Sequence, residues 1–377
     1  MLCFCHFIFG AAKITILIAQ FTHLKVQKLS LVFFKNHNDL SLEMEEVTAI
    51  AGLNGVGKTS VLDAIHFLCL GKSYFSSTDV QCIQTDQLQS GILAEIENKD
   101  KFHLKVKLKR GGRKIIEKNS IPYKHLSEHI GQFLAVVIAP NDIELIYGTN
   151  DKRRSFTNQI ISQINHEHLK TLVKYNKLIE HRNKHLKEDT VDLTLIQTLD
   201  EQIGPLAQNI FEARTRFFEE FSSYFNIKYH QLSDNKEHIK LIYNSQLSKN
   251  TYTELVNINR TKDIAIRRSS SGTHKDEIEI ELDNFSLKKY GSQGQIKSGL
   301  IALKLAEFEY LKDKKEWTPI LLLDDIFEKI DEERSKVLTE IIKNGNFGQI
   351  FITDTNSSRL KSFCEEIGKP FKTITLD

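Results

Sequence analysis

The sequence predicts an α/β domain that is interrupted by a mainly helical insertion. Residues 47–51 form a short apolar strand that runs directly into a glycine-rich loop. Residues 320–323 form a second, very apolar strand that ends in two acidic residues. Between them, from about residue 152 to residue 225, the pattern becomes helical and strongly charged. Strands that alternate with helices at both ends of the chain are typical of an α/β architecture.

Composition sets broad limits on the class of protein. The chain has 377 residues, enough for two to three domain-sized units. With 51 Lys and Arg against 49 Asp and Glu, the net charge of +2 excludes a histone-like polycation. Nucleic-acid binding stays open, because local patches of charge decide it. The five Cys residues are odd in number and form no C-x-x-C pair, which argues against a disulfide framework or a zinc ribbon and indicates a reducing cytoplasm.

Residues 1–22 are apolar but match no targeting pattern. Lys13 is the only clear charge in Met1–Gln20 and lies in the middle, whereas a secretory signal begins with basic residues. Lys13 and Gly10-Ala11-Ala12 also interrupt the run of about 20 apolar residues that a membrane span needs. We interpret residues 1–22 as an upstream extension, with a membrane anchor as the alternative. No other stretch approaches membrane-spanning length, so we expect no membrane partner.

The remaining elements follow from apolar spacing. Alternation predicts a hairpin over residues 29–44 with one buried face, formed by Leu29, Leu31, Phe33, Leu40, Leu42 and Met44. Further strands are expected in residues 92–118, with a turn at Gly111-Gly112, and in residues 134–139. In the helical part, Leu169, Leu172, Val173 and Ile179 share one face. After a polar stretch at 233–271 we expect strands at 277–282 and 349–352 and helices at 297–311 and 332–343.

The glycine-rich loop matches the phosphate-binding pattern G-x-x-x-x-G-K-[ST]. Its glycines let backbone N–H groups curl around phosphate oxygens, and an amphipathic helix is expected to follow and to point its positive end at the anion. Lys58 is expected to reach the β- and γ-phosphates of ATP, and the Thr59 hydroxyl to ligate Mg²⁺. The predicted ATP-binding residues are Gly52, Leu53, Asn54, Gly55, Val56, Gly57, Lys58, Thr59 and Ser60.

Two acidic residues end the apolar strand at 320–323. We expect this strand to lie beside strand 47–51, so that Asp324 holds the Mg²⁺ shell. Asp325, one residue further, is the candidate catalytic group that orients or activates the attacking water, together with Lys58. The alternative is an apolar strand that merely ends in a polar turn.

A second glycine-containing loop precedes the helix expected from Lys297. Ser292, Gln293, Gly294 and Gln295 offer a hydroxyl and backbone N–H groups at a helix N-terminus. The alternative is a simple N-capped helix. The loop resembles the signature loop of ABC-type ATPases, usually Ser-Gly-Gly-Gln, which closes over the γ-phosphate held by a partner subunit. Glu328–Asp331 falls where such ATPases carry a dimer-contact loop, but Thr353-Asp354-Thr355 replaces their usual Thr-His pair.

From Leu24 onward the chain resembles the RecF family of bacterial recombination and gap-repair ATPases. The resemblance rests on motifs in the family's order: Phe34-Lys35-Asn36-His37, Asn54–Thr59 with Leu62–Ile65, Gly71–Phe75, Pro140–Ile146 with Gly148, Arg153–Phe156, Tyr175–Lys177, His181-Arg182-Asn183, Gly291–Lys297 and Leu322–Phe327. Gly272-Thr273-His274-Lys275-Asp276-Glu277 departs from the usual Gly-Pro-His-Arg-Asp-Asp, and residues 1–22 have no counterpart.

The resemblance implies an ABC-type head, like that of SMC proteins, without the long coiled coil. It divides the chain into the extension 1–22, an ATPase domain in two parts (23–150 and 266–377) and a helical insertion (151–265). It further implies ATP-induced dimerisation on double-stranded and gapped DNA and weak DNA-stimulated ATP hydrolysis. It also implies cooperation with RecR and RecO to load RecA, support of the SOS response, and binding of single-stranded DNA.

Basic residues indicate where DNA would bind. One predicted hairpin carries Lys105, Lys107, Lys109, Arg110, Arg113 and Lys114, flanked by Lys101 and Lys118. The helical insertion carries Arg153, Arg154, Lys170, Lys174, Lys177, Arg182, Lys184 and Lys187. Such clusters neutralise phosphates without reading bases. The alternative is a solvated charged face.

Three other classes of protein compete with this interpretation. A transport ATPase subunit needs a membrane partner and a switch His that the sequence does not show. A small-molecule P-loop kinase is usually shorter and has no signature loop. A structural DNA-binding protein with a degenerate nucleotide site would not need the intact set Lys58, Thr59, Asp324 and Asp325.

Overall fold

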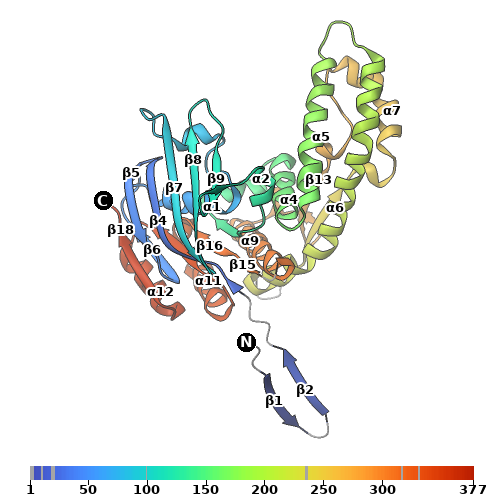
Figure 1. Ribbon diagram of the computed structural model, residues 1–377. Helices are drawn as coiled ribbons and strands as arrows, with labels where there is room; N and C mark the ends of the chain where they lie inside the picture. Colours follow the sequence, from blue (N-terminus) through green and yellow to red (C-terminus); the bar gives the residue numbers. More distant parts are fainter. Residues whose placement is uncertain are drawn as a thin grey trace.

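The computed structural model describes residues 4–9, 12–17, 22–98, 100–233, 237–315, 317–329 and 332–377. Two sheets and the helices around them form the body of the molecule, and a helical arm rises beside them (Figure 1). The α/β core with an inserted helical region is as the sequence predicts. The boundaries at 150–151 and 265–266 stay a prediction, although the arm helices do begin at Asn150 and end at Ala265.

A five-stranded parallel sheet forms one half of the core. Its order is β11 (Ala135–Ile138), β16 (Ile320–Leu323), β17 (Ile350–Asp354), β6 (Val47–Ala51) and β18 (Phe371–Thr375). The expectation that strand 320–323 lies beside strand 47–51 is wrong, because β17 lies between them and pairs with both. The carboxyl ends of all three strands nevertheless lie on one edge of the sheet, where ligands of open α/β sheets bind.

A six-stranded antiparallel sheet covers the other half. Its order is β10 (Ile121–Pro122), β9 (Ile115–Lys118), β8 (Lys101–Lys109), β7 (Gln89–Glu97), β4 (Lys25–Phe34) and β5 (His37–Glu43). The predicted hairpin is β4 with β5. Leu29 and Leu31 are buried, but Phe33 is not the third inward residue. Phe33 has a φ of 50°, which breaks the alternation and turns Phe34 into the core instead.

Helix α1 (Lys58–Leu70) lies between the two sheets, in contact with β11 and β17 on one side and with β7 and β8 on the other. The sequence predicts an amphipathic helix here, and this is wrong: every residue of α1 except Thr59 is buried. A helix covered on both sides has no solvent-exposed face, so its polar residues, such as Ser60 and Asp63, contact other residues of the protein instead of water. The loop before α1 is therefore fixed by the most enclosed helix of the domain.

The helical arm consists of α4 (Asn150–Ile164), α5 (His166–His185), α6 (Leu193–Ser233) and α7 (Tyr252–Ala265). Leu172 and Ile179 of α5 are buried as predicted, whereas Val173 is exposed. The polar stretch 233–271 is more ordered than expected, because it contains α7 and the strand β12 (Ile239–Asn244). Strand β12 pairs with β13 (Glu277–Leu282), which pairs in turn with β14 (Phe285–Ser286).

The remaining elements complete the body. They are α2 (Leu126–His129), α3 (Glu144–Tyr147), α8 (Leu287–Tyr290), α9 (Gln293–Lys315), α10 (Ile326–Lys329), α11 (Glu332–Asn344) and α12 (Ser357–Ile367). Short 3₁₀ turns occur at Asp79–Cys82, Pro140–Ile143, Gln246–Ser248 and Thr273–Lys275.

Strand β3 (Thr22–His23) pairs with β15 (Trp317–Thr318), and β1 (Phe4–Phe9) pairs with β2 (Ala12–Leu17) in a hairpin that Figure 1 shows apart from the body. The rest of the predicted extension 1–22 lies outside the described residues. Within the described part of the chain, no helix has both the length and the apolarity to cross a bilayer.

Arg182 holds the arm together from inside. Its guanidinium is fully buried and donates to Asp200 (Nε–Oδ1, 2.6 Å) and to Asp263 (Nη1–Oδ2, 2.7 Å). Because these partners come from α6 and α7, one α5 side chain joins three helices. Arg182 is therefore not a surface cation for DNA, as the sequence analysis had grouped it.

Replacing Arg182 by Met should lower the free energy of unfolding of the arm by about 3–5 kcal/mol, because two buried carboxylates lose their counter-charge. Urea titration followed by circular dichroism measures the change. The matched control is Lys177→Met on the exposed side of the same helix, with an expected effect within about 0.5 kcal/mol. Equal effects of the two substitutions would contradict the conclusion that Arg182 stabilises the arm by joining α5 to α6 and α7.

Candidate functional site

The glycine-rich loop joins β6 to α1 and is shaped by backbone conformations that favour glycine. Gly55 has a φ of 91° and Gly57 a φ of 102°, and Gly57 forms the N-cap of α1. A Cβ at Gly57 would lie 2.5 Å from Nε2 of His37, so there is no room for a side chain. The loop therefore needs glycine at position 57 for both space and conformation.

The tip of the β4–β5 hairpin rests on this loop. Asn36 donates through Nδ2 to the carbonyl oxygen of Gly55 (2.9 Å), and His37 donates through Nε2 to that of Gly57 (3.1 Å). Lys35 forms an ion pair with Asp63 of α1 (2.6 Å). Spacing alone gives no signal for these contacts, because the hairpin precedes the loop by about one strand. Only the resemblance to the family singled out Asn36 and His37.

Lys58 is the basic residue of the loop, and its side chain is almost fully buried. Its Nζ donates to the carbonyl oxygens of Gly52 (2.9 Å) and Leu53 (3.1 Å). The ammonium group is thus held inside the curve of the loop. A phosphate that enters the loop meets this charge together with the N-terminus of α1.

Thr59 and Asp324 meet although β17 separates their strands. The Thr59 hydroxyl donates to Oδ1 of Asp324 (2.9 Å), and the Thr353 hydroxyl, from the end of β17, donates to the same oxygen (2.9 Å). The backbone N–H of Asp325 in turn donates to Oγ1 of Thr353 (3.0 Å). Thr353, which belongs to the intervening strand β17, thus connects this strand to Asp324 and Asp325 at the end of β16. The sequence analysis missed this role because it treated Thr353 only as part of a departure from the usual Thr-His pair.

Burial raises the pKa of Asp324 above its ordinary value. The two hydroxyl donors, Thr59 and Thr353, oppose this shift, the charge of Asp325 adds to it, and the charge of Lys58 lowers it. Asp325 itself has a φ of 42°, a left-handed conformation that costs energy for a residue with a Cβ. Backbone strain of this kind is common at functional sites.

The oxygen donors at this edge suit a small divalent cation. Mg²⁺ prefers carboxylate, hydroxyl and water oxygens, and Thr59 and Asp324 already present a hydroxyl and a carboxylate to each other. A cation placed there would take up the charge of a carboxylate whose pKa burial raises. The residues present therefore fit Mg²⁺ with a bound triphosphate.

The second glycine-containing loop begins α9 at Gln293, four residues earlier than expected. Ser292 caps the helix: its Oγ accepts from the N–H of Gln295 (3.2 Å), and the Gln295 side chain accepts from the N–H of Ser292 (2.7 Å). This reciprocal pair is a capping box, so the alternative of an N-capped helix holds locally. Ser292 and Gln293 are nevertheless exposed, and the capped loop still offers its hydroxyl to a ligand from outside.

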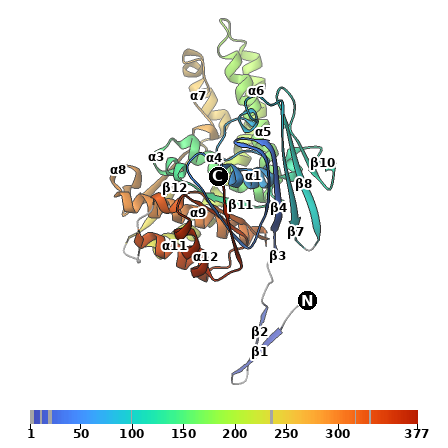
Figure 2. The same cartoon turned by 90° about the vertical axis from the view of Figure 1, so that its left-hand side faces the viewer.

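The two loops lie in different parts of the molecule. Figure 2 shows α8, which leads into Ser292, at the left of the molecule, away from the C-terminal end of β18 that packs on Gly52. Among the described residues, no hydrogen bond joins residues 292–295 to residues 52–60. Gln295 instead binds Glu237 (2.7 Å), and Arg334 lies against Gly294. The expected dimer-contact loop includes Ile330 and Asp331, which lie outside the described residues, as do the side chains of Glu328 and Lys329.

Asp354 stands where the superfamily often has its switch His. It is buried and forms a bidentate ion pair with Arg359, at 2.6 and 2.8 Å. The guanidinium of Arg359 lies over the ring of Phe327 (5.8 Å). Asp354 therefore joins β17 to α12, as a structural contact within the fold.

The predicted DNA residues of the β8–β9 hairpin divide into two groups. Lys105, Lys109 and Arg113 are exposed and without a described partner. Lys107 pairs with Glu117 (2.6 Å) and Lys114 with Asp79 (3.0 Å), while Arg110 donates to the carbonyl oxygens of residues 83, 84 and 87. Lys105 and Lys109 on the outer face of β8 and Arg113 after the following turn thus offer a short row of cations without a partner among the described residues, whereas Lys107, Arg110 and Lys114 contact neighbouring residues.

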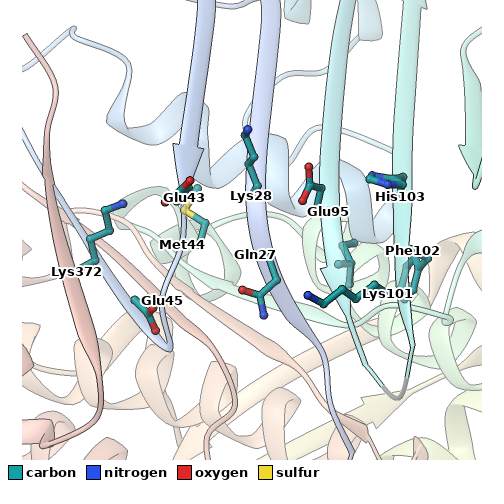
Figure 3. Close-up of a pocket in the computed structure, with 11 residues that line it drawn as sticks. Gln27, Lys28, Glu43, Met44, Glu45, Glu95, Lys101, Phe102, His103 and Lys372 are labelled. Atoms are coloured by element: carbon teal, nitrogen blue, oxygen red, sulfur yellow. The ribbon is translucent and has the colours of Figure 1, made fainter.

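The opposite end of the same sheet contains a cavity of about 390 Å³ (Figure 3). Its lining includes Lys28, Glu43, Glu95 and His103, which sit on neighbouring strands in one row. Glu43, Lys28 and Glu95 alternate in charge along this row, and His103 stands at its end. The acidic and basic side chains of this row neutralise one another across the paired strands, so the cavity favours neither an anionic nor a cationic ligand.

Comparison with known proteins places the chain in a family. The DNA replication and repair protein RecF of Flavobacterium johnsoniae is 39% identical over 93% of this chain and 99% of that protein. The chain belongs to the RecF family. RecF of Parabacteroides distasonis is 38% identical over 89% of this chain and 92% of its own length. A family model described as an AAA domain matches residues 28–361.

Solved structures agree with this membership. A structure of the recombination mediator protein RecF with ATPrS in the RecFOR pathway superposes with a TM-score of 0.83 and 25% identity, covering 94% of this chain and 98% of that one. A RecF–ATP structure gives 0.82 and 27%, covering 90% and 94%. An Smc head domain from Pyrococcus furiosus shares only the fold, at 0.52 and 16% identity over 90% and 92%. The predicted ABC-type, SMC-head-like fold is confirmed.

The position of His37 makes Gly57 and Gly55 a matched pair for mutation. Gly57→Ala should lower the melting temperature of the ligand-free protein more than Gly55→Ala does. Both place alanine at positive φ, at about 1–2 kcal/mol, but only the Cβ at 57 meets His37, whereas nothing lies within 4 Å at 55. Adding His37→Ala to Gly57→Ala should recover part of the loss. Equal melting temperatures for the two single variants would contradict this account of the loop.

Proposed function

We propose that this chain is an ATP-dependent DNA-binding ATPase of replication and recombinational repair. The observation that carries the proposal is the contact between Thr59 and Asp324, which brings the phosphate-binding loop and the acidic strand end together across β17. The names of its relatives support the repair role. The RecF structures with ATP support ATP as the nucleotide.

The residues take distinct roles at the ATP site. The backbone of Gly52–Ser60 and the Lys58 ammonium hold the phosphates, while Thr59 and Asp324 hold Mg²⁺. Mg²⁺, when bound, neutralises charge on the phosphate oxygens. Asp325 accepts the proton of the attacking water, and its strained backbone fixes where the carboxylate points. Hydrolysis is weak, and its role is to switch the state of the protein.

ATP acts as a ligand for a dimer. Among the described residues, no hydrogen bond joins the Ser292 loop to the phosphate-binding loop of the same chain, and α8, which leads into Ser292, lies away from the C-terminus in Figure 2. A second copy, facing the first, would place its Ser292 hydroxyl on the γ-phosphate held by Lys58. The closed state is then favoured only as far as ATP binds it more tightly than the open state. Loss of the γ-phosphate opens the dimer.

The dimer binds double-stranded and gapped DNA through its phosphates. Lys105, Lys109 and Arg113 form a row on β8 and the turn that follows, and they carry no partner in the described part of the chain. Such contacts position a duplex without reading its sequence. We assign RecR as the direct protein partner, acting with RecO to load RecA at gaps and to support the SOS response, in the cytoplasm. Membership of the RecF family supports this over a transport ATPase subunit.

Substitution at Ser292 separates dimerisation from nucleotide binding. Ser292→Arg should keep the protein monomeric with ATP and Mg²⁺, because the long side chain blocks the partner's γ-phosphate, while each chain still binds ATP. Asp325→Asn should accumulate a dimer that persists with ATP. Sedimentation velocity with ATP and then ADP measures both, and Lys58→Ala is the control that loses ATP. A wild-type protein that stays monomeric with ATP and duplex DNA would contradict the scheme.

Charge reversal tests the DNA surface. The triple variant Lys105→Glu, Lys109→Glu, Arg113→Glu should bind duplex DNA more weakly and should reduce the slope of log affinity against log salt by about 3, roughly 0.9 for each lost phosphate contact. ATP binding should persist. The control reverses three exposed lysines on α11 and α12, Lys336, Lys343 and Lys361. If both triples weaken DNA binding equally, β8 is not the DNA surface.

A further inference from the structure

Asp325 keeps an unusual backbone conformation at the edge of the sheet that carries the ATP site. Its φ of 42° is left-handed, and a residue with a Cβ adopts this conformation only at a cost in energy. Such a conformation persists where the surrounding contacts hold it. The backbone N–H of Asp325 donates to Oγ1 of Thr353 (3.0 Å), which fixes the residue on its N-terminal side. On its C-terminal side the contacts come from α12.

Helix α12 contacts the segment after Asp325 through the ring of Phe327, which is buried. The guanidinium of Arg359 lies over this ring, 5.8 Å from its centre. The ring of Phe363 meets it edge to face, with centroids 5.2 Å apart. Arg359 and Phe363 are four residues apart and therefore share one face of α12. Both contacts bear on Phe327, two residues after Asp325.

The guanidinium of Arg359 is itself held by Asp354, at the end of β17. The two hydrogen bonds, at 2.6 and 2.8 Å, reach both oxygens of this buried carboxylate. Asp354 also accepts from the N–H of Asn356 (2.8 Å), and Asn356 caps α12 by accepting from the N–H of Arg359 (3.1 Å). A bidentate pair fixes the plane of a guanidinium as well as its position. The end of β17 therefore sets the orientation of the group that lies over Phe327.

The turn at Asp325 is thus held at two points by one strand end. Thr353 binds its N–H directly, and Asp354 acts on Phe327 through Arg359. We propose that Arg359 is a positioning residue for ATP hydrolysis: by stacking on Phe327 it holds the left-handed turn, and so the direction of the Asp325 carboxylate. The inference rests on the proposed ATPase function and adds to it a residue that acts through another.

This role predicts a loss of rate without a loss of nucleotide binding. In the proposed site, the phosphates are held by the loop Gly52–Ser60 with Lys58, in a segment of the chain far from α12. The Asp325 carboxylate acts only on the attacking water. A reacting group displaced by about 1 Å can slow a reaction about a hundredfold although the substrate still binds. Loosening Phe327 should therefore lower kcat and leave the Kd for ATP unchanged.

The test is Phe327→Leu, which removes the ring and leaves the ion pair between Asp354 and Arg359 in place. Arg359→Met is a poorer probe, because it would leave the buried Asp354 without its counter-charge and destabilise the fold. Hydrolysis is measured with saturating ATP and Mg²⁺ in the presence of duplex DNA. Phe327→Leu should lower kcat roughly tenfold to a hundredfold, with the Kd of a fluorescent ATP analogue unchanged. The control Lys361→Met, at an exposed position of α12, should hydrolyse ATP like the wild type.

Arg359→Lys separates positioning from an effect of charge alone. Lysine keeps a counter-charge for Asp354 but has no planar group to form the bidentate pair and to lie over the ring. Its kcat should fall as that of Phe327→Leu does, and the double variant should lose no more than the larger of the two single losses. A wild-type kcat for Arg359→Lys would show that only the charge is needed, and would overturn the positioning role.

The remaining outcomes each decide one point. A wild-type protein that does not hydrolyse ATP overturns the proposed function, and this inference with it. A wild-type kcat for a folded Phe327→Leu overturns the positioning role alone, as does a Kd that rises as much as kcat falls. Sedimentation equilibrium with adenylyl imidodiphosphate, a non-hydrolysable ATP analogue, measures dimerisation, and a kcat that falls only in step with the dimer also overturns it. Circular dichroism shows which variants are folded at the assay temperature, and Arg359→Lys decides alone if Phe327→Leu is not among them.

Discussion

The carboxylate of Asp324 is the point where the separate parts of the ATPase domain are joined. One of its oxygens accepts hydrogen bonds from Thr59, after β6, and from Thr353, at the end of β17. Thr353 also receives the N–H of Asp325. Three neighbouring strand ends are thus held in one register by a single acid. Because that acid is buried, removing either hydroxyl leaves its charge poorly satisfied.

A second set of buried polar groups connects the phosphate-binding loop to the signature helix. Asp63 of α1 accepts from Lys35, from Ser73 and from the N–H of Tyr74. Tyr74 donates its hydroxyl to Asp142, and the ammonium of Lys304 on α9 lies 5.7 Å from the Tyr74 ring centre. Burial raises the pKa of Asp142, and the charge of Lys304 opposes that shift. This chain of contacts from Asp63 through Tyr74 to Lys304 links α1 to α9, although the two helices pack in different clusters of the core.

Much of the core could be predicted from the sequence because its strands are short and are either uniformly apolar, as in residues 320–323, or alternate strictly, as in residues 277–282. Strands 277–282 and 320–323 have the predicted bounds, and the loop at Gly52–Thr59 lies where the pattern placed it. The errors have physical causes. Strand order was misjudged because apolar spacing says nothing about which strand inserts between two others. The burial of α1 was missed because the covering sheet is distant in sequence, and Arg182 was grouped with surface cations because its partners, Asp200 and Asp263, lie 18 and 81 residues away.

Helix α6 is continuous over 41 residues, with Pro205 inside it, and so spans about 60 Å. Its first half lies in the core of the arm, around Ile203 and Ile210. Its second half packs on α9, where Phe217 and Phe221 meet Tyr310. One helix therefore packs both in the arm and against α9. A displacement of the arm that moved α6 as one piece would therefore also shift Phe217 and Phe221 against Tyr310 of α9, the helix that begins at Gln293.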